Sequence, residues 1–186
     1  SFIGDKKIKD KKLLDVIVSE EHKFWKFVSN TVYLNENLID LDKRLLENYY
    51  KNLGFYGVKV LSSFAEFDKN GNFNLIYNIS AGDYHYFNDL KLNLPLDYNV
   101  KDFDKIKKTF TKLKGKKFSL NDLNQILSEI DRIASLRLYD FIDAEVDEEI
   151  VDNDKIILTF KIKDSNKFYV EKINILGNHT TIEEVV

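Results

Sequence analysis

One sequence pattern occurs twice in the chain, about 85 residues apart, and this repeat constrains the fold more than any other feature. Leu53 to Val60 (LGFYGVKV) returns as Tyr139 to Val146 (YDFIDAEV). An amphipathic helical stretch precedes each copy, and each copy leads through a polar turn into an alternating strand, Phe73 to Ile79 or Ile156 to Ile162. Self-similarity at a fixed period indicates an array of small units. Such arrays mainly bind and space other molecules.

Length and composition agree with an array of two units. The 186 residues suit two units of roughly 80 residues each, and a hydrophobic content of 44% supports packed cores. The net charge of −3, with acidic and basic residues interleaved, argues against nucleic acid as a partner. No apolar run approaches the roughly 20 residues of a membrane-spanning helix, so we expect a soluble piece. The absence of cysteine excludes disulfides and thiolate zinc sites. One proline and seven glycines leave no flexible linker, so the units should abut.

The first unit is predicted to hold two helices. A short one should cover Lys11 to Val18, and a longer one should begin after Asn35 as N-cap. Gly54 stands where a residue of positive φ ends a helix. The apolar stripe of the longer helix is predicted at Leu38, Leu41, Leu45, Tyr49 and Leu53.

A hairpin should follow these helices. Val58 to Phe64 alternates, with Val58, Val60, Ser62 and Phe64 on one face, which is typical of a half-buried strand. Residues 68–72 (DKNGN) predict a tight turn. The return strand is Phe73 to Ile79.

The second unit repeats this order with its opening strand present, so each unit reads β-α-α-β-β. Ser119 should cap the second helix, residues 144–150 should form strand two, and residues 151–154 should turn the chain. We therefore predict an α+β fold in which each unit is a three-stranded mixed sheet covered on one face by two helices. The predicted buried positions are Phe87, Leu90 and Leu92 in strand one, Phe103, Ile106, Phe110 and Leu113 in the first helix, and Leu120, Leu123, Leu127, Ile130 and Ala134 in the second.

Two stretches carry a resemblance to a known family. Glu47 to Val60 (ENYYKNLGFYGVKV), together with Asn78 to Asp83 (NISAGD), is similar to the POTRA repeats (polypeptide-transport-associated domains) of BamA-type outer-membrane β-barrel assembly factors. Residues 168–186 (FYVEKINILGNHTTIEEVV) resemble the start of a further repeat. Asp140 departs from the pattern, since it stands where the first unit has Gly54. The implied division is residues 1–82, a unit lacking most of its first strand, residues 83–165, a complete unit, and residues 166–186.

The resemblance implies a sheet order of one-three-two, with strand one parallel to strand three and strand two at the exposed edge. It implies a periplasmic scaffold, ahead of a membrane barrel, that binds unfolded outer-membrane protein precursors and accessory lipoproteins. No enzyme activity, cofactor or metal is expected. The alternatives are a POTRA region of another transport barrel, in two-partner secretion or organelle import, and an RNA-binding KH-like module. The KH reading depends on the basic connection Lys112 to Lys117, which has one glycine.

Strand two of each unit is the candidate site, because a three-stranded sheet leaves main-chain groups unpaired at its edges. An extended peptide can add to such an edge through main-chain hydrogen bonds. The acidic run of strand two in the second unit should face away from the core and discourage promiscuous pairing. The candidate edge residues are Val58, Lys59, Val60, Leu61 and Ser62 in the first unit, and Asp143, Ala144, Glu145, Val146, Asp147 and Glu148 in the second.

Other candidate sites are weaker. The three histidines, His22, His85 and His179, are too dispersed to predict a metal site. A calcium loop starting at Asp68 would need Gly at its sixth position and Glu at its twelfth, where this chain has Phe73 and Ile79. The aromatic cluster Phe24, Trp25 and Phe27 is expected to pack onto the first unit's core, with a partner anchor as the alternative.

Overall fold

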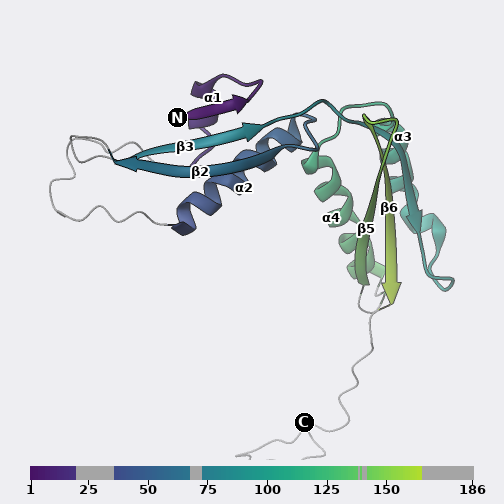
Figure 1. The fold of residues 1–186 in the computed structure, drawn as a ribbon. Helices are drawn as coiled ribbons and strands as arrows, with labels where there is room; N and C mark the ends of the chain where they lie inside the picture. The colour runs from purple at the N-terminus through teal and green to yellow at the C-terminus, as the bar shows by residue number, and fades with distance from the viewer. Residues whose placement is uncertain (20–35, 68–72, 138, 140–141, 165–186) are drawn as a thin grey trace, which may run out of the picture.

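The computed structural model describes residues 1–19, 36–67, 73–137, 139 and 142–164, and shows two units joined end to end (Figure 1). The strands of the two units run in different directions, so the chain bends at the junction. Several predictions lie outside the described residues: the N-cap at Asn35, the turn at 68–72, Asp140, His22, His179, the aromatics at 24–27, and the further repeat at 166–186.

Each unit has a three-stranded mixed sheet in the predicted order. In the first unit, β1 (Phe2–Asp5) runs parallel to the central β3 (Phe73–Ser80), and β2 (Lys59–Phe67) is antiparallel to β3 at the opposite edge. In the second, β4 (Tyr86–Asn93) is parallel to the central β6 (Lys155–Asp164), and β5 (Ile142–Val151) is antiparallel to β6. Both sheets therefore carry their second strand at an edge, as predicted.

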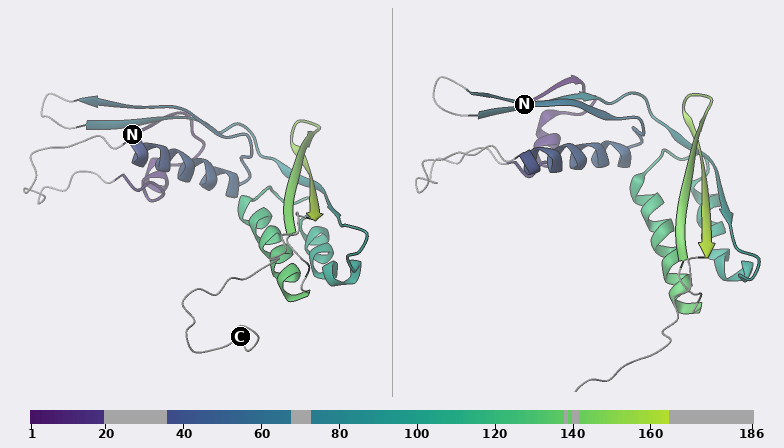
Figure 2. Two further views of the ribbon diagram at one scale, coloured as in Figure 1. Left: turned by 90° about the horizontal axis from the view of Figure 1, so that it is seen from below. Right: turned by 60° about the horizontal axis from the view of Figure 1, so that its bottom comes forward.

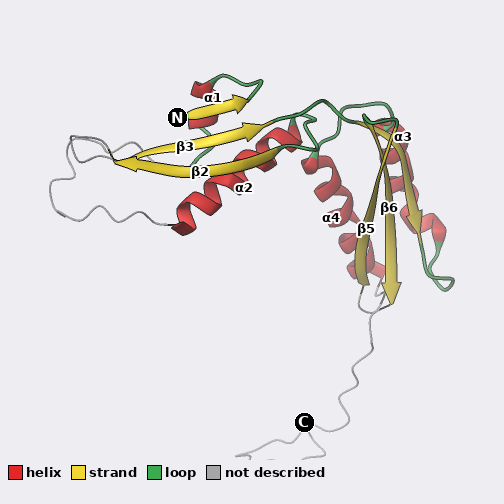
Figure 3. Ribbon diagram, in the orientation of Figure 1, coloured by secondary structure: helices red, strands yellow, loops and turns green. Residues whose placement is uncertain are grey.

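Helices cover one face of each sheet, as Figures 2 and 3 show. The first unit has α1 (Asp10–Leu14) and α2 (Glu36–Asn52). The second has a 3₁₀ turn, η1 (Val100–Phe103), followed by α3 (Asp104–Leu113) and α4 (Leu120–Arg137). The first helix ends at Leu14 and is shorter than the predicted Lys11 to Val18.

The core of the second unit forms as its helical stripes predict. Phe103, Ile106, Phe110 and Leu113 are all buried, and the ring of Phe110 stacks on that of Phe160 with centroids 5.5 Å apart. Ser119 caps α4, since its Oγ accepts a hydrogen bond from the Asp122 amide at 3.2 Å. On α4 the burial extends beyond the predicted stripe to Ile126 and Ile133, while Leu120 and Leu127 pack at the margin of the core.

The stripe predicted on α2 is wrong by about one position. Leu38 and Leu53 are exposed, whereas the fully buried positions are Asp42, Leu46 and Tyr50. The carboxylate of Asp42 accepts hydrogen bonds from the Val18 amide at 2.7 Å and the Tyr77 hydroxyl at 2.7 Å. Because these donors replace water, a charged residue can occupy the core face. Counting apolar residues alone therefore selected the neighbouring stripe.

The C-terminus of α2 is closed by a Schellman motif. The Phe55 amide donates to the Tyr50 carbonyl at 3.1 Å, and the Gly54 amide donates to the Lys51 carbonyl at 3.2 Å. Gly54 has φ +103°, which confirms the predicted positive φ. The rings of Tyr50 and Phe55 meet edge to face with centroids 5.7 Å apart, the apolar contact that accompanies this motif.

The second unit closes its helix with the same long-range bond. The Tyr139 amide donates to the Ala134 carbonyl at 3.1 Å, so Tyr139 takes the structural place of Phe55. The sequence repeat instead aligns Phe55 with Phe141. The structural correspondence between the two helix ends therefore differs by two residues from the correspondence that the sequence repeat gives.

A β-bulge interrupts the alternation predicted for strand two of the first unit. Val60 lies opposite Ile79 and Ser62 opposite Asn78, so Leu61 is the extra residue, and its side chain is 63% exposed. After the bulge the residue opposite the buried Tyr77 is Ser63. The even-numbered inward face of the prediction therefore holds at Val58 and Val60, where the bulge shifts the register.

The hairpin of the second unit turns where predicted. Asp152 and Asn153 have φ of +51° and +63°, values that short polar residues tolerate better than most. Val151 and Lys155 pair on either side of the turn.

The two units meet through the loop that follows α2. The ring of Tyr56 packs against the second unit's core, edge to face with Phe118 at 5.0 Å between centroids, and near His85 at 5.5 Å. Its hydroxyl donates to the carboxylate of Glu148 on β5. Burial, and then this hydrogen bond, raises the pKa of Tyr56 to about 12.

Two hydrogen bonds from main-chain amides reinforce the junction. The His85 amide donates to the Gly54 carbonyl at 2.8 Å, and the Asn121 amide donates to Asn52 Oδ1 at 2.7 Å. The ring of Tyr84 stacks on Phe55 with centroids 4.3 Å apart. The connection between the sheets is therefore ordered and hydrogen-bonded, as expected for a chain without a flexible linker.

Candidate functional site

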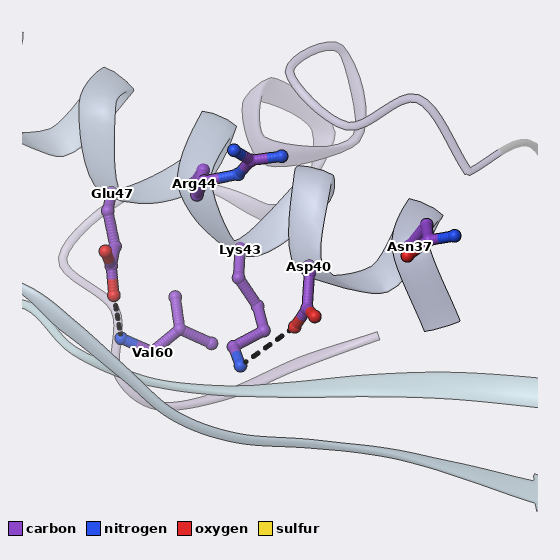
Figure 4. Close-up of a pocket in the computed structure, with 6 residues that line it drawn as sticks. All are labelled: Asn37, Asp40, Lys43, Arg44, Glu47 and Val60. Atoms are coloured by element: carbon purple, nitrogen blue, oxygen red, sulfur yellow. Dashed lines mark hydrogen bonds and ion pairs between the residues drawn. The ribbon is translucent and has the colours of Figure 1, made fainter. Parts of the chain in front are cut away.

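β2 forms one edge of the first unit's sheet. In the described part of the chain, β2 pairs with β3 alone. A hollow of about 610 Å³ lies between β2 and α2 (Figure 4). Side chains of α2 and one residue of β2 line it: Asn37, Asp40, Lys43, Arg44, Glu47 and Val60.

One hydrogen bond joins the two walls of this hollow. The Val60 amide donates to Glu47 Oε1 at 3.0 Å, and Figure 4 shows the Glu47 side chain reaching down from α2 to that amide. The bond shows that the Val60 N–H points toward α2 and away from β3. At this position the strand's edge donor is therefore satisfied by a side chain of its own unit.

Three of the four other lining residues are charged, and two of these form an ion pair. Lys43 Nζ lies 3.4 Å from Asp40 Oδ1. Arg44 makes no ion pair with any residue that the structure describes, although Glu47 follows it by one helical turn. Because the hollow has two acidic and two basic side chains, no net charge dominates it.

The five candidate residues of the first unit take different positions relative to the edge of β2. Val58 precedes β2, is buried, and donates its amide to the Phe55 carbonyl at 3.3 Å, so it is not part of the edge. Lys59 and Ser62 pair with Ser80 and Asn78 of β3. Of the five, Val60 alone lines the hollow, with its N–H capped by Glu47, and Leu61 is the exposed residue at the bulge.

The candidate residues of the second unit all lie in β5, whose outer side pairs with no other described strand. Their side chains alternate between faces. Ala144, Val146 and Glu148 lie opposite buried residues of β6, with Ala144 and Val146 packed at the margin of the core. Glu145 and Asp147 are exposed on the other face, as predicted, while Asp143 pairs with Lys163 in register.

Cross-strand ion pairs engage the outward acids of β5. Lys163 lies 2.5 Å from Glu145, and Lys161 pairs with Asp147. Both pairs are substantially exposed, so each contributes little to stability. They do hold the acidic side chains over the sheet face, which leaves the main chain of β5 as the group presented at the edge.

Sequence reasoning missed two features of these edges. The sequence pattern assigned no role at the strand edge to Arg44 or Glu47, and only the packing of α2 along β2 brings them to the strand. Tyr56 was quoted as part of the repeat, without a role at the junction. A helical projection centred on Leu46 and Tyr50 would have placed Glu47 at the flank of the buried face.

Two of the other candidates, His85 and the basic connection at 112–117, lie within the described residues. His85 is buried, and its Nδ1 lies 3.1 Å from the Asp83 carbonyl. The basic connection between α3 and α4 is engaged within the protein, since Lys117 lies over the Tyr84 ring at 3.4 Å and Lys114 pairs with Asp89 at 3.9 Å. Over the described residues there is no group of three or more His, Cys, Asp or Glu that could hold a metal ion. No helix in the same residues is long and apolar enough to cross a membrane.

Comparison with known proteins identifies the units. Residues 1–82 match the family model of POTRA, described as surface antigen variable number repeat. The crystal structure of Haemophilus influenzae BamA POTRA3-5 superposes with a TM-score of 0.66 at 13% identity, covering 100% of this chain and 72% of that one. BamA from Haemophilus ducreyi lacking POTRA domains 1-3 gives 0.55 at 13% identity, over 76% of this chain and 25% of that one. The first unit is a POTRA repeat, and the second has the same fold.

The whole chain is similar to part of two BamA proteins. Outer membrane protein assembly factor BamA of Neisseria meningitidis serogroup B is 22% identical over 188 residues, and that of Neorickettsia risticii is 20% identical over 185 residues. Both alignments cover 100% of this chain but only 23% and 25% of those proteins. The chain thus spans about a quarter of the length of these curated relatives, and it corresponds to part of a periplasmic POTRA region.

Proposed function

We propose that this region is a periplasmic scaffold that receives extended polypeptide segments by β-strand addition at β2 and β5. Its partners are outer-membrane protein precursors in transit and accessory lipoproteins of the assembly complex. The proposed division is into units 1–82 and 83–165, with a further unit beginning at 166. The name of the relatives, outer membrane protein assembly factor, supports this class of partner.

The observation that carries the proposal is the hollow along β2. It lies on the unpaired side of an edge strand, so an added strand would have both a main-chain partner and a helix wall beside it. The lining residues on α2 extend from Asn37 to Glu47. Ten helical steps cover about 15 Å, which is the length of roughly four or five residues in an extended strand.

Main-chain pairing also explains how one edge can serve many partners. Strand addition takes most of its affinity from backbone hydrogen bonds, with side-chain pockets adding selectivity. The hollow is polar and without net charge, so it imposes a weak side-chain preference. That property suits a factor that handles precursors of different sequence.

Paired proline substitutions test the mechanism. Adjacent residues of an antiparallel strand direct their N–H groups to opposite sides, so one residue of each neighbouring pair faces outward. Ser62→Pro and Ser63→Pro test β2, and Glu145→Pro and Val146→Pro test β5. In each pair, the variant that removes the inward N–H should lower the melting temperature. The other variant should fold but lose affinity for a short peptide of alternating apolar and polar residues, measured by titration.

A charge variant separates this mechanism from electrostatic recognition. The combined replacement of Asp143, Glu145 and Asp147 by Ser should change peptide affinity little, because backbone groups make the contacts. If folded proline variants of both strands bind like the parent while the serine variant loses binding, recognition runs through charge and strand addition is wrong.

A further inference from the structure

The hydrogen bond between Glu47 and Val60 occupies the position where a strand added to β2 would bind. The Val60 N–H faces the hollow, and the carboxylate of Glu47 is its acceptor at 3.0 Å. We propose that Glu47 is an internal competitor, a side chain that stands in for the main-chain carbonyl of an added strand and must be displaced before that strand can pair at Val60. This inference rests on the proposed function of β2.

The chemistry of the bond sets its effect on binding. A hydrogen bond to an ionised acceptor is roughly twice as strong as one between neutral groups. An incoming peptide carbonyl is neutral. Replacing the Glu47 carboxylate by this carbonyl as the acceptor of the Val60 N–H is therefore unfavourable at that one position. A segment must therefore gain further main-chain bonds along β2 before it binds, and short or poorly extended segments are rejected.

The released carboxylate has partners within reach. Arg44 and Lys43 lie three and four residues before Glu47 on the same helix, which is the spacing at which side chains of neighbouring turns meet. Both residues line the hollow with Glu47. Arg44 makes no ion pair with a described residue, so its guanidinium can form an ion pair with the displaced carboxylate. Displacement of Glu47 is thus reversible and does not leave an unpaired charge.

The second unit lacks this arrangement. Aligned by the helix-closing bonds, in which Tyr139 takes the place of Phe55, the residue of α4 that corresponds to Glu47 is Asp131. Its side chain is one methylene shorter and exposed, and it makes no hydrogen bond to β5 in the part of the chain that the structure describes. The two edges therefore differ. A side chain of α2 occupies an edge amide of β2, whereas Asp131 of α4 makes no such bond to β5 in the described residues.

Glu47→Ala and Glu47→Gln in the whole chain test the inference, with Asp131→Ala as the matched control. The first readout is hydrogen exchange of the Val60 amide followed by NMR. Glu47→Ala should accelerate exchange about tenfold, the equivalent of roughly 1.4 kcal/mol. Glu47→Gln should give a smaller increase, because its amide oxygen still accepts but carries no charge. Asp131→Ala should leave the Val60 amide unchanged.

The second readout is affinity for the alternating peptide. Glu47→Ala should bind it several-fold more tightly than the parent, with Glu47→Gln between them and Asp131→Ala equal to the parent. Unchanged or weaker binding by Glu47→Ala overturns the competitor role, since Glu47 would then be neutral or a peptide contact. Val60 exchange that does not respond to Glu47→Ala also overturns it.

The two readouts distinguish this inference from the proposed function. If the peptide binds the parent and β2 proline variants abolish binding, strand addition stands whatever Glu47 does. If no variant binds the peptide at β2, the docking role of this strand fails and the competitor role is overturned with it, even where exchange at Val60 confirms the hydrogen bond.

Discussion

The hydroxyl of Tyr56 in the first unit donates a hydrogen bond to the carboxylate of Glu148 in the second, and the Tyr56 ring packs on Phe118. One side chain thus combines apolar packing with a charge-assisted hydrogen bond at the junction. The contact therefore ties the loop after α2 to β5, the edge strand of the second unit.

Tyr56→Ala should loosen the junction more than Tyr56→Phe does. The alanine variant loses both the ring packing and the hydrogen bond, whereas the phenylalanine variant loses the hydrogen bond alone. Small-angle X-ray scattering should show a broader distance distribution for Tyr56→Ala and a near-parental one for Tyr56→Phe. Equal broadening in both would mean that the hydroxyl, and not the ring, holds the units together.

The hydroxyl of Tyr56 should titrate at a higher pH than that of an ordinary tyrosine. Its pKa is raised from 10.0 to about 12 by burial and by the bond to Glu148. A raised pKa means that the stabilising contribution is complete below pH 10.0 and is lost as the pH rises through about 12. The difference in tyrosinate absorbance between the parent and Tyr56→Phe should rise near pH 12. A difference curve centred near 10.0 would contradict a buried, hydrogen-bonded hydroxyl.

Gly54→Val should destabilise the first unit by roughly 1–2 kcal/mol. Gly54 has φ +103°, and a Cβ at this position would meet Tyr84 Cδ1 at 3.2 Å and Lys117 Cβ at 3.3 Å. Gly57→Val is the matched control, because the nearest atom to a Cβ at Gly57 is His85 Cε1 at 4.0 Å. Thermal melts should separate the two variants, and identical melting temperatures would show that the helix end tolerates a side chain.

Asp42 and Tyr77 should be energetically coupled. The Asp42 carboxylate is fully buried, and it accepts hydrogen bonds from the Tyr77 hydroxyl and from the amides of Val18 and Ser19. Burial, and then the bond to Asp42, raises the pKa of Tyr77 above its ordinary value. A double-mutant cycle of Asp42→Ala and Tyr77→Phe, measured by urea unfolding, should give a coupling of roughly 0.5–3 kcal/mol. Additive effects would show that the contact does not stabilise the fold.

Glu129 should make the second unit sensitive to acid. Its carboxylate receives two hydrogen bonds from Arg132, at 2.7 and 2.8 Å, and lies 3.1 Å from Lys105 of α3. The bonds from Arg132 are the main reason that its pKa falls from 4.5 to about 2. The stabilising contribution is therefore complete above pH 4.5 and is lost as the pH falls toward 2.

Glu129→Gln should flatten the pH dependence in that window. Urea unfolding of the parent should show a free energy of unfolding that declines as the pH falls from 4.5 toward 2, with a shallower decline in the variant. Parallel declines would assign the acid sensitivity to other carboxylates. Glu149→Gln on the exposed face of β5 is the control and should follow the parent.

The repeated sequence pattern was sufficient to predict the α+β class and the β-α-α-β-β order, because hydrophobic periodicity reports which face of each element is buried. The edge position of strand two was an expectation from the resemblance to POTRA repeats. The sequence also located the positive φ of Gly54 and the cap at Ser119, since helix ends are specified by local residues. The face of α2 was misjudged, because the buried Asp42 is acceptable only once Val18 and Tyr77 supply hydrogen bonds from distant parts of the chain.

What the sequence determined by itself is local: element type, the turn at residues 151–154, the end of α2 at Gly54 and the cap of α4 at Ser119. The tertiary structure alone decided which groups meet across elements. The bulge at Leu61, the reach of Glu47 to Val60 and the insertion of Tyr56 beside Glu148 depend on packing between segments far apart in the chain. No local pattern encodes these contacts, because each depends on how a helix lies across a sheet or how one unit rests on the next.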